Sequence, residues 1–591
     1  MQTENNEKPS LVETRDGFSV FYKERFLYSK YNPKKTNEEL VSRTNILSGT
    51  LVLICSPILC YALLPLLEKL DENSFALLVE KDENLFALSK KNFDDLQNEN
   101  ATLFLRCAFA HPNELSSLPL TLSKKNPVLA NGNVLPKAGT FRRVVRLDFS
   151  AGVQFHKSFY DELTNALTNT IAQFWKNRIT LSKLGKLFSK NVFRNLAFIP
   201  NAIPFQTFEK KITKPIVVLA SGESIEKLIP SIKQFREHFF LLAVDASIPL
   251  LVSEKIIPDA IVTEESQLAI AKSFFSFPRE TILFASLSSF APRLIPQSQL
   301  CFFAPRFDDT FFFDKLVENE IIEKEFPPLG SVGISAIHLA RLLRSSNDVP
   351  IFFAGNDFAF SLGKTHARGT LHSVSQLCKT NKCSPVENYG ACFSHGAKKI
   401  ECENGNAFFS SVSLLGYKEF FKQYFAEAAN LYDAGFYEID VGVKKISCAR
   451  LEEIFALLQQ SENNARSAPF CAECGRSSEW RVYENNIARK KIKSEKVLAF
   501  LESEKNALGE LKAILATGKT RDGIAPDEKS RNEKISELLS AREYLYLHFP
   551  DGNDAKITHA FLTRVRSEID FFLKTISTAK ANLQNATEKP Q

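Results

Sequence analysis

The stretch 214–235, KPIVVLASGESIEKLIPSIKQF, decides the fold of this chain. Its apolar front (215–220) predicts a buried strand, SGES (221–224) a tight turn, and the apolar residues that follow at helical spacing a helix. Pro230 cannot lie deep in a helix, so we expect a short turn over 224–229 and a main helix with Pro230 at its first position. Such a junction presents backbone N–H groups and a positive dipole end, which suit a phosphate, although Ser and Gly also serve as a plain cap and turn.

Acidic residues follow the next two predicted strands. FFLLAVDASIPLLVSEKIIPDAIVTEE contains a buried strand that ends at Asp245, a helix, a Pro-Asp pair (258–259), and a third strand that ends at Glu264 and Glu265. In an open parallel sheet, residues at the carboxyl ends of the strands lie on the edge that binds ligands. The sequence therefore predicts an acidic ligand-binding edge.

Two later segments extend this edge. PPLGSVGISAIHLARLLR places a Gly/Ser turn (330–333) at the start of a helix, whose His338 lies among apolar residues and is expected to be a core histidine. VPIFFAGNDFAFSLGKTHARGT then places a strand (351–354) before Gly355-Asn356-Asp357, with His366 nine residues after Asp357. Both segments favour a site assembled from several strand ends.

The N-terminal part has the same alternation of strands and helices. Residues 50–150 alternate short apolar runs, such as LVLIC and SFALLVEKD, with helical segments, which is typical of parallel βαβ units. Nucleotide-binding folds carry glycines after the first strand, because the backbone must approach the phosphate closely. The turn here is Cys55-Ser56-Pro57, without glycine, so we expect a degenerate Rossmann-like domain.

The rest of the chain is predicted to be largely helical outside the central region. Residues 157–198 have helical periodicity, and the charge-dense segments beyond Cys448 read as amphipathic helices suited to docking. The predicted fold class is α/β and multi-domain. The predicted domains are an N-terminal Rossmann-like α/β domain (1–155), a helical connector (156–209), a central α/β domain (210–447) and a C-terminal helical domain (448–591).

Charge and hydropathy exclude some functions. Lys and Arg number 74 and Asp and Glu 68, a balance that argues against nucleic acid or an anionic membrane as the main partner. The uncharged stretch 44–67 is broken by Pro57 and Pro65 and is expected to form a strand, a loop and a helix start, with a spanning helix as the alternative. The polar start, MQTENNEKPS, predicts no signal peptide, and we expect a cytoplasmic protein.

The cysteines suggest no framework. Four of them gather near His372 and His395, at Cys378, Cys383, Cys392 and Cys402, but their spacing matches no common zinc pattern. Cys471 and Cys474 form a CxxC pair without an obvious second pair. We expect free thiols, with metal binding or redox chemistry as the alternatives.

The order of the central motifs resembles the motility accessory factor (Maf) flagellin glycosyltransferase family, which is related to the 6-hydroxymethylpterin pyrophosphokinase MptE-like superfamily. SGESI (221–225) resembles the family's Gly-Pro-Ser-Leu-like turn, and VDAS (244–247) resembles its Asp-containing strand. PDAIVTEE (258–265) contains the Pro-Asp pair, and GSVG (330–333) resembles the Gly-Ser-Val helix start. GNDFAF…THARG (355–369) resembles the Gly-x-Asp-Leu-Ala motif with a following histidine. RNLAFIPNAIPF and NLYDAGFYEIDVGVKKI are similar to the flanks of the family's central domain. The resemblance covers roughly residues 45–460.

This resemblance implies a sialyltransferase-like central domain that moves a nucleotide-activated sugar, a CMP-linked nonulosonic acid such as pseudaminic or legionaminic acid, to Ser or Thr of flagellin. It implies a role in flagellum assembly and motility. The implied catalytic residues are His366, which as a histidine suits a general base, and Asp357; His372 competes with His366 for the role. The implied nucleotide-sugar-binding residues are Ser221, Gly222, Glu223, Ser224, Asp245, Glu264, Ser331, Gly333, Gly355 and Asn356. We expect flagellin and the sugar donor as partners, no nucleic acid, no membrane insertion and no tightly bound cofactor, with a divalent metal as an alternative.

Two departures from the family keep other functions open. Glu223 replaces the family's proline in the phosphate turn, and AGFYEIDVG (434–442) lacks its paired glycines. One alternative is a Mg-dependent pterin pyrophosphokinase-like enzyme, with oxygen ligands from Asp245, Asp259, Glu264 and Glu265. The other is a non-catalytic flagellin-binding protein built on a transferase fold.

Overall fold

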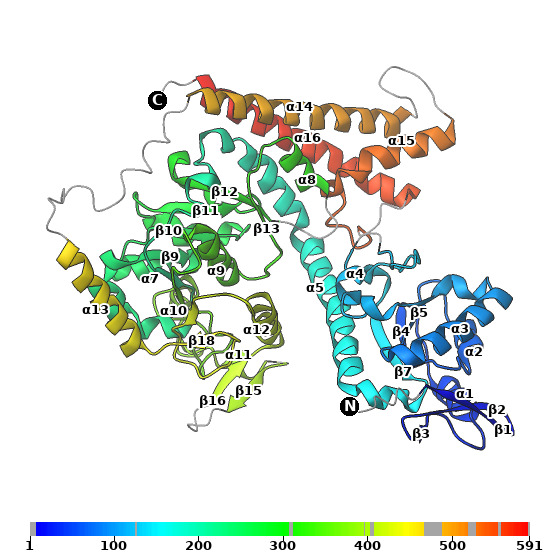
Figure 1. Ribbon diagram of the computed structural model, residues 1–591. Helices are drawn as coiled ribbons and strands as arrows, with labels where there is room; N and C mark the ends of the chain where they lie inside the picture. Colours follow the sequence, from blue (N-terminus) through cyan, green and yellow to red (C-terminus); the bar gives the residue numbers. More distant parts are fainter. Residues whose placement is uncertain are drawn as a thin grey trace. The chain divides into compact units, whose positions relative to one another are not determined.

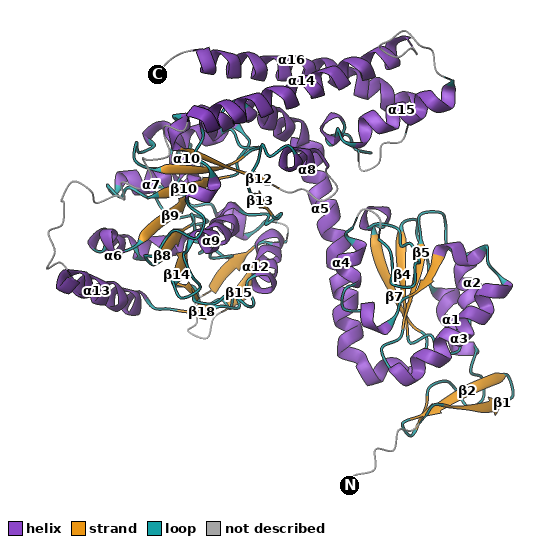
Figure 2. Cartoon of the chain, turned by 45° about the horizontal axis from the view of Figure 1, so that its top comes forward, coloured by secondary structure: helices purple, strands orange, loops and turns teal. Residues whose placement is uncertain are grey.

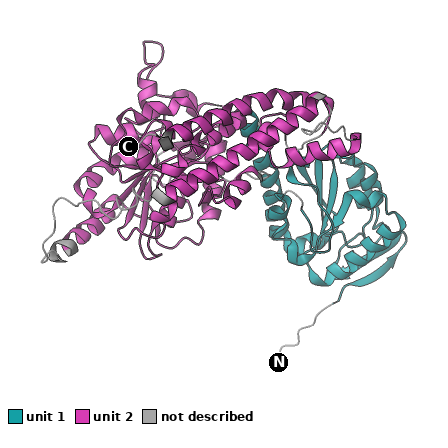
Figure 3. Ribbon diagram, turned by 90° about the horizontal axis from the view of Figure 1, so that it is seen from above, with its two compact units in different colours: residues 1–183 teal, residues 184–591 magenta. Residues whose placement is uncertain are grey.

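The chain forms two compact units. The computed structural model describes residues 8–588 except 125–126, 306–310, 395, 402–406, 466–486, 518–526 and 553–556. Unit 1 comprises Met1–Lys183 and unit 2 comprises Leu184–Gln591 (Figure 3). The division into four domains, inferred from the sequence, remains a prediction, and the structure itself separates into these two units.

Unit 1 is built on a parallel sheet of order β6-β5-β4-β7 (Figure 1). Its strands are β4 (Thr50–Cys55), β5 (Phe75–Val79), β6 (Cys107–Phe109) and β7 (Arg143–Asp148). Its helices are α1 (Lys35–Arg43), α2 (Leu63–Glu68), α3 (Glu83–Glu99), α4 (Leu118–Leu122) and α5 (Lys157–Leu196), the last of which continues into unit 2. A small antiparallel sheet precedes them, formed by β1 (Ser10–Thr14), β2 (Gly17–Tyr22) and β3 (Arg25–Phe26).

The uncharged stretch 44–67 forms part of the core of unit 1. It contains β4, in which every residue is buried, a loop, and the start of α2, as the sequence predicts. Among the described residues, no helix combines the length and the apolar character needed to cross a membrane.

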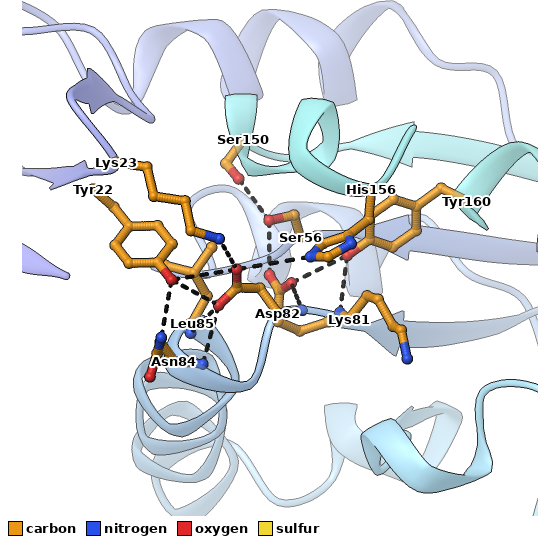
Figure 4. A network of polar contacts seen from close by, with 11 residues as sticks. Tyr22, Lys23, Ser56, Lys81, Asp82, Asn84, Leu85, Ser150, His156 and Tyr160 are labelled. Atoms are coloured by element: carbon orange, nitrogen blue, oxygen red, sulfur yellow. Dashed lines mark hydrogen bonds and ion pairs between the residues drawn. The ribbon is translucent and has the colours of Figure 1, made fainter. Parts of the chain in front are cut away.

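Polar side chains meet at the carboxyl edge of this sheet, where the strand order reverses between β4 and β7 (Figure 4). The Ser56 hydroxyl donates to Glu80 at 2.7 Å, the Ser150 hydroxyl donates to Ser56 at 2.9 Å, and the Tyr160 hydroxyl donates to Glu80 at 3.1 Å. Burial raises the pKa of Glu80. At this place, where nucleotide-binding folds hold their ligand, the turn at Ser56 has no glycine, and side chains of the protein are hydrogen-bonded to one another.

Unit 2 contains a nine-stranded sheet of order β13-β12-β11-β10-β9-β8-β14-β17-β18, with every neighbouring pair parallel (Figures 1 and 2). The strands are β8 (Ile216–Leu219), β9 (Phe240–Val244), β10 (Ala260–Thr263), β11 (Ile282–Ser286), β12 (Leu300–Pro305), β13 (Glu325–Phe326), β14 (Ile351–Ala354), β17 (Leu431–Asp433) and β18 (Lys444–Lys445). A separate hairpin pairs β15 (Lys398–Glu401) with β16 (Ala407–Ser410). The predicted fold class, α/β with several domains, is confirmed.

Helices cover both faces of this sheet. Strand residues Val218 and Leu242 share one core with Ile334 of α9 (Val332–Leu343) and Phe421 of α12 (Val412–Tyr424). Alternate strand residues point to the opposite face, where α6 (Ile229–Gln234) and α7 (Ile248–Ser253) pack. The remaining helices are α8 (Phe311–Glu318), α10 (Leu371–Leu377), α11 (Tyr389–Cys392), α13 (Cys448–Ala465), α14 (Ile487–Thr517), α15 (Glu528–Ser540) and α16 (His559–Glu588).

The helices after Cys448 belong to the same hydrophobic core as the sheet. Leu508 of α14 and Phe572 of α16 belong to one buried cluster with Leu219 and Leu241 of the strands. Glu504 of α14 is buried and accepts hydrogen bonds from Arg542 at 3.0 Å and Tyr544 at 2.7 Å. Figures 1 and 2 show α14 and α16 lying side by side.

Candidate active site

The candidate site lies where the strand order of unit 2 reverses. The chain runs from β8 outward through β9 to β13, then crosses back so that β14 pairs with the free side of β8. In open α/β sheets, the crevice beyond the carboxyl ends of two such strands binds ligands. The SGES turn follows β8 and Gly355-Asn356-Asp357 follows β14, so the topology brings two of the predicted motifs together.

The turn after β8 fits closely against the turn after β14. The Gly222 N–H donates to the Gly355 carbonyl at 2.9 Å. A β-carbon at Gly222 would lie 2.5 Å from the Gly355 oxygen and closer still to Asp357 Oδ2, so only glycine fits. Gly355 has a φ of +81°, in the left-handed region that favours glycine.

Asp357 is buried and bound to the turn. The Ser224 N–H donates to Asp357 Oδ2 at 3.0 Å, and the Ser224 hydroxyl donates to Oδ1. The Ser224 hydroxyl in turn accepts from the Gly355 N–H at 2.8 Å. Burial, with smaller contributions from the carboxylates of Asp433 and Glu223, raises the pKa of Asp357 to about 7. Asp357 therefore exchanges its proton in the neutral pH range.

The charge of Glu223 is compensated by neighbouring side chains. Burial tends to raise the pKa of Glu223, but hydrogen bonds from Ser361, Tyr437 and Lys364 outweigh this, and the pKa is lowered. The Tyr437 hydroxyl donates to Glu223 at 2.6 Å and the Lys364 ammonium at 3.0 Å. The Glu223 carboxylate is thus bonded to a tyrosine and a lysine.

His366 lies on a loop that is hydrogen-bonded to the SGES turn. The N–H of the next residue, Ala367, donates to the Ser221 carbonyl at 3.0 Å. The His366 ring is 3.1 Å from the Thr365 hydroxyl and stacks on His372, with ring centroids 4.4 Å apart. Burial, together with the charge of His372, lowers the pKa of His366 to about 4, so its imidazole is neutral at pH 7. His366 and His372, the two candidates for the general base, are therefore in contact.

A second set of predicted residues follows β9 and β10. The Thr263 hydroxyl donates to Asp245 at 2.6 Å, and the Ser335 hydroxyl of α9 donates to Glu264 at 3.0 Å. Burial raises the pKa of Asp245 to about 6 and that of Glu264 to about 7. Their carboxyl groups are therefore partly protonated near neutral pH.

The start of α9 joins this second set to the strand-order reversal. Ser331 is the N-cap residue of α9, and Gly333 lies in its first turn. The Asn356 side-chain amide donates to the Gly333 carbonyl at 3.0 Å. The helix start and the turn after β14 are thus directly connected.

Asp259, considered as a metal ligand only in the pyrophosphokinase-like alternative, lies away from the other acids. It precedes β10 and therefore lies at the amino edge of the sheet, opposite Asp245 and Glu264. There it pairs with Arg236 at 2.8 Å and accepts from the Leu241 N–H at 2.7 Å. The expectation that Asp259 shares a metal site with the other acids is wrong, because the residue before a strand and the residue after it lie at opposite ends.

The structure also shows the surroundings of His338 and of several cysteines. His338 packs edge-on against Phe326, at a centroid distance of 5.0 Å, and its ring lies 3.0 Å from the Tyr424 hydroxyl, as expected for a core histidine. Cys378, Cys383 and Cys392 are free thiols. Cys402, His395, Cys471 and Cys474 lie outside the described residues. Within the described ranges, no three His, Cys, Asp or Glu side chains are grouped as metal ligands would be.

Four site residues were missed from the sequence. Lys364 forms an ion pair with Glu223, Tyr437 donates a hydrogen bond to it, and Asp433 at the end of β17 binds Lys445 at 3.0 Å. Asp433 could have been found, since it is an acid at the end of an apolar strand next in line at the same edge. No local pattern identifies Lys364, Tyr437 and Lys445.

Fold and site together define an α/β protein with a polar, acid-rich sheet edge at the strand-order reversal. Residues 190–363 match the family described as 6-hydroxymethylpterin diphosphokinase MptE-like. The chain shares its fold with the solved Maf glycosyltransferase from Magnetospirillum magneticum AMB-1, with a TM-score of 0.53 and 14% identity, over 99% of this chain and 94% of that one. The resemblance found in the sequence is thereby confirmed: the chain contains an MptE-like domain and has the fold of a Maf glycosyltransferase.

A relative of similar length is also known. A protein from Treponema pallidum (strain Nichols), described as an uncharacterized protein, is 28% identical over an alignment of 607 residues, which spans 97% of this chain and 96% of the relative. The likeness therefore extends over both units.

The raised pKa of Asp357 leads to an expected pH dependence of stability. The folded protein keeps this proton up to about pH 7, whereas an unfolded chain releases it near the usual value of 3.8. The contribution of Asp357 to stability therefore decreases as the pH rises from about 4 to about 7, then levels off. Relative to Asp357→Asn, the free energy of unfolding of the wild type is expected to fall by on the order of 4 kcal/mol across this range.

Urea unfolding at a series of pH values measures this difference. Asp245 and Glu264 titrate in both proteins, so their contributions cancel in the comparison. A difference between the two proteins that does not change with pH would contradict the assignment.

Proposed function

We propose that this protein is a glycosyltransferase that moves a nucleotide-activated sugar, a CMP-linked nonulosonic acid, to Ser or Thr hydroxyls of flagellin, and so supports flagellum assembly and motility. The observation that carries the proposal is the hydrogen bond from the Ala367 N–H to the Ser221 carbonyl. This bond holds the backbone next to a neutral histidine against the turn at the strand-order reversal. A general base close to the place where the donor phosphate would bind suits the transfer of an activated sugar to a hydroxyl group.

In this proposal His366 is the general base. Its imidazole accepts the proton of the flagellin hydroxyl as that oxygen attacks the anomeric carbon of the sugar, and the nucleotide leaves with the electrons of the broken glycosidic bond. The low pKa of His366 belongs to the donor-free protein. The negative charge of a bound donor phosphate would raise that pKa toward neutrality and make the base stronger.

Acidic side chains at the sheet edge are compatible with an anionic donor when they are protonated or paired with a cation. Asp245, Glu264 and Asp357 have pKa values of about 6, 7 and 7, so each is partly protonated near neutral pH. Glu223 is paired with Lys364. The edge therefore carries less negative charge than its acidic residues suggest.

Intact-mass spectrometry of flagellin tests the proposal. Flagellin from cells with the gene is expected to be heavier by one or more nonulosonic acid residues than flagellin from cells without it. Purified protein, CMP-nonulosonic acid and unmodified flagellin should reproduce the gain in mass. An unchanged flagellin mass on deletion, together with no transfer in vitro, would overturn the proposal.

The match to the MptE-like family favours a second candidate, a pterin pyrophosphokinase-like enzyme. This function would require Mg²⁺ and a nucleoside triphosphate. One of the four acids considered for the metal, Asp259, lies at the opposite edge of the sheet. Calorimetric titration with CMP, and with ATP plus Mg²⁺, separates the two functions, and binding of neither would favour the non-catalytic flagellin-binding alternative.

A further inference from the structure

Two backbone N–H groups of the SGES turn, those of Gly222 and Ser224, are already bonded within the protein. The Gly222 N–H donates to the Gly355 carbonyl, and the Ser224 N–H donates to Asp357. The Ile225 N–H points to the Gly222 carbonyl at 3.4 Å. A phosphate bound at this turn cannot use the Gly222 and Ser224 N–H groups without breaking these bonds, and a cation beside the turn would supply a further donor.

Lys364 is a cation that the structure places beside the turn. Its ammonium group is 3.0 Å from Glu223 and 2.8 Å from Glu226, and its side chain is 24% exposed. A lysine ammonium has three N–H donors. Two are used by these carboxylates, and within the described part of the chain the third has no partner.

The same contacts fix the loop that carries His366. Glu226 also accepts from the Arg368 N–H at 2.6 Å, and the Ala367 N–H donates to the Ser221 carbonyl. Lys364 and Glu226 therefore tie residues 364–368 to the turn from both sides of His366. The Lys364 side chain thus connects the loop that carries His366 to the two glutamates of the turn and the helix after it.

We propose that Lys364 is a donor-phosphate ligand that also positions the His366 loop: its ammonium, held between Glu223 and Glu226, gives its remaining N–H to the phosphate of the nucleotide-activated sugar. This rests on the proposed function, since it assigns a residue to the donor of that reaction. Glu223 also accepts a hydrogen bond from Tyr437, so it stays fixed when the ammonium shares its donors with the phosphate. The phosphate thus gains a charged hydrogen bond while the turn keeps its shape.

Paired titrations with CMP and cytidine test the phosphate contact, because the two probes differ only in the phosphate. Calorimetry on the full chain is expected to show that Lys364→Met weakens CMP binding at least tenfold and changes cytidine binding less than twofold. Lys364→Arg, which keeps the charge, is expected to restore most of the CMP affinity. Lys382→Met, at an exposed lysine of the same segment, is the matched control.

The positioning of the His366 loop can be measured without a sugar donor. Glu226→Gln removes one carboxylate and leaves Lys364 charged, so amide hydrogen exchange at residues 364–368 is expected to increase without any ligand. Its CMP affinity is expected to stay the same or to rise, because one competitor for the ammonium is gone. Unchanged exchange would overturn the positioning role.

The outcomes separate this inference from the proposed function. A wild-type protein that binds CMP and transfers sugar, with Lys364→Met equally active, overturns the role of Lys364 alone. An equal loss of CMP and cytidine binding in Lys364→Met shows a purely structural role and also overturns it. A wild-type protein that binds neither probe and transfers no sugar overturns the proposed donor and, with it, the role of Lys364.

Discussion

Replacing His366 with alanine is expected to lower the turnover number for sugar transfer by at least about a hundredfold, the usual contribution of a general base. The affinity for CMP should change little, because the imidazole is proposed to act on the acceptor hydroxyl. Steady-state kinetics with purified flagellin, together with CMP titration, separate the two effects. In cells, the variant should leave flagellin at its unmodified mass.

Two further histidine variants make this result specific. His559→Ala, at an exposed position at the start of α16, is the matched control and should keep full activity. His372→Ala removes the ring that stacks on His366 and tests its competitor. If His372→Ala abolished transfer while His366→Ala kept it, the role of base would pass to His372.

The substitution Gly222→Ala is expected to have the largest effect on the site as a whole. The added methyl group would lie 2.5 Å from the Gly355 carbonyl oxygen and closer to Asp357, so the turns after β8 and β14 must separate. Such overpacking costs about 1–3 kcal/mol of stability. CMP affinity should fall at least tenfold, because the two turns that form the site no longer meet.

Gly509→Ala is the matched control for that experiment. Gly509 lies within α14 and has open space where a β-carbon would be, so alanine should stabilise the helix by up to about 1 kcal/mol. Thermal unfolding and CMP titration measure both variants. A Gly222→Ala protein with wild-type stability and wild-type CMP affinity would show that the close contact is not required.

Much of the fold follows from local pattern. The strand, turn and helix expected over 214–235 are present, with Pro230 in the first turn of α6 and a short 3-10 helix, Glu223–Lys227, before it. Buried parallel strands are continuous apolar runs, and β-sheet topology then places their carboxyl ends at one edge. This is why Asp245, Glu264 and Asp357 could be assigned to one edge from the sequence.

The pairing within the site could not be predicted in the same way. Glu223 meets Lys364 across 141 residues of sequence and Tyr437 across 214, and no local periodicity encodes such contacts. The sequence alone therefore shows that Glu223 replaces a proline but does not show which side chains compensate its charge. Asp259 was a different kind of error, since its position before a strand already places it at the opposite edge.

The core that the central sheet shares with α14 and α16 has a consequence for how the protein is made. One face of the sheet, including Leu219 and Leu241, is completed by residues as late in the chain as Phe572. During synthesis this apolar face has to wait for almost the whole polypeptide to leave the ribosome, and exposed surface of this kind favours aggregation. A premature stop before α16 should therefore yield insoluble protein, and nascent chains should be clients of chaperones until the last helix has emerged.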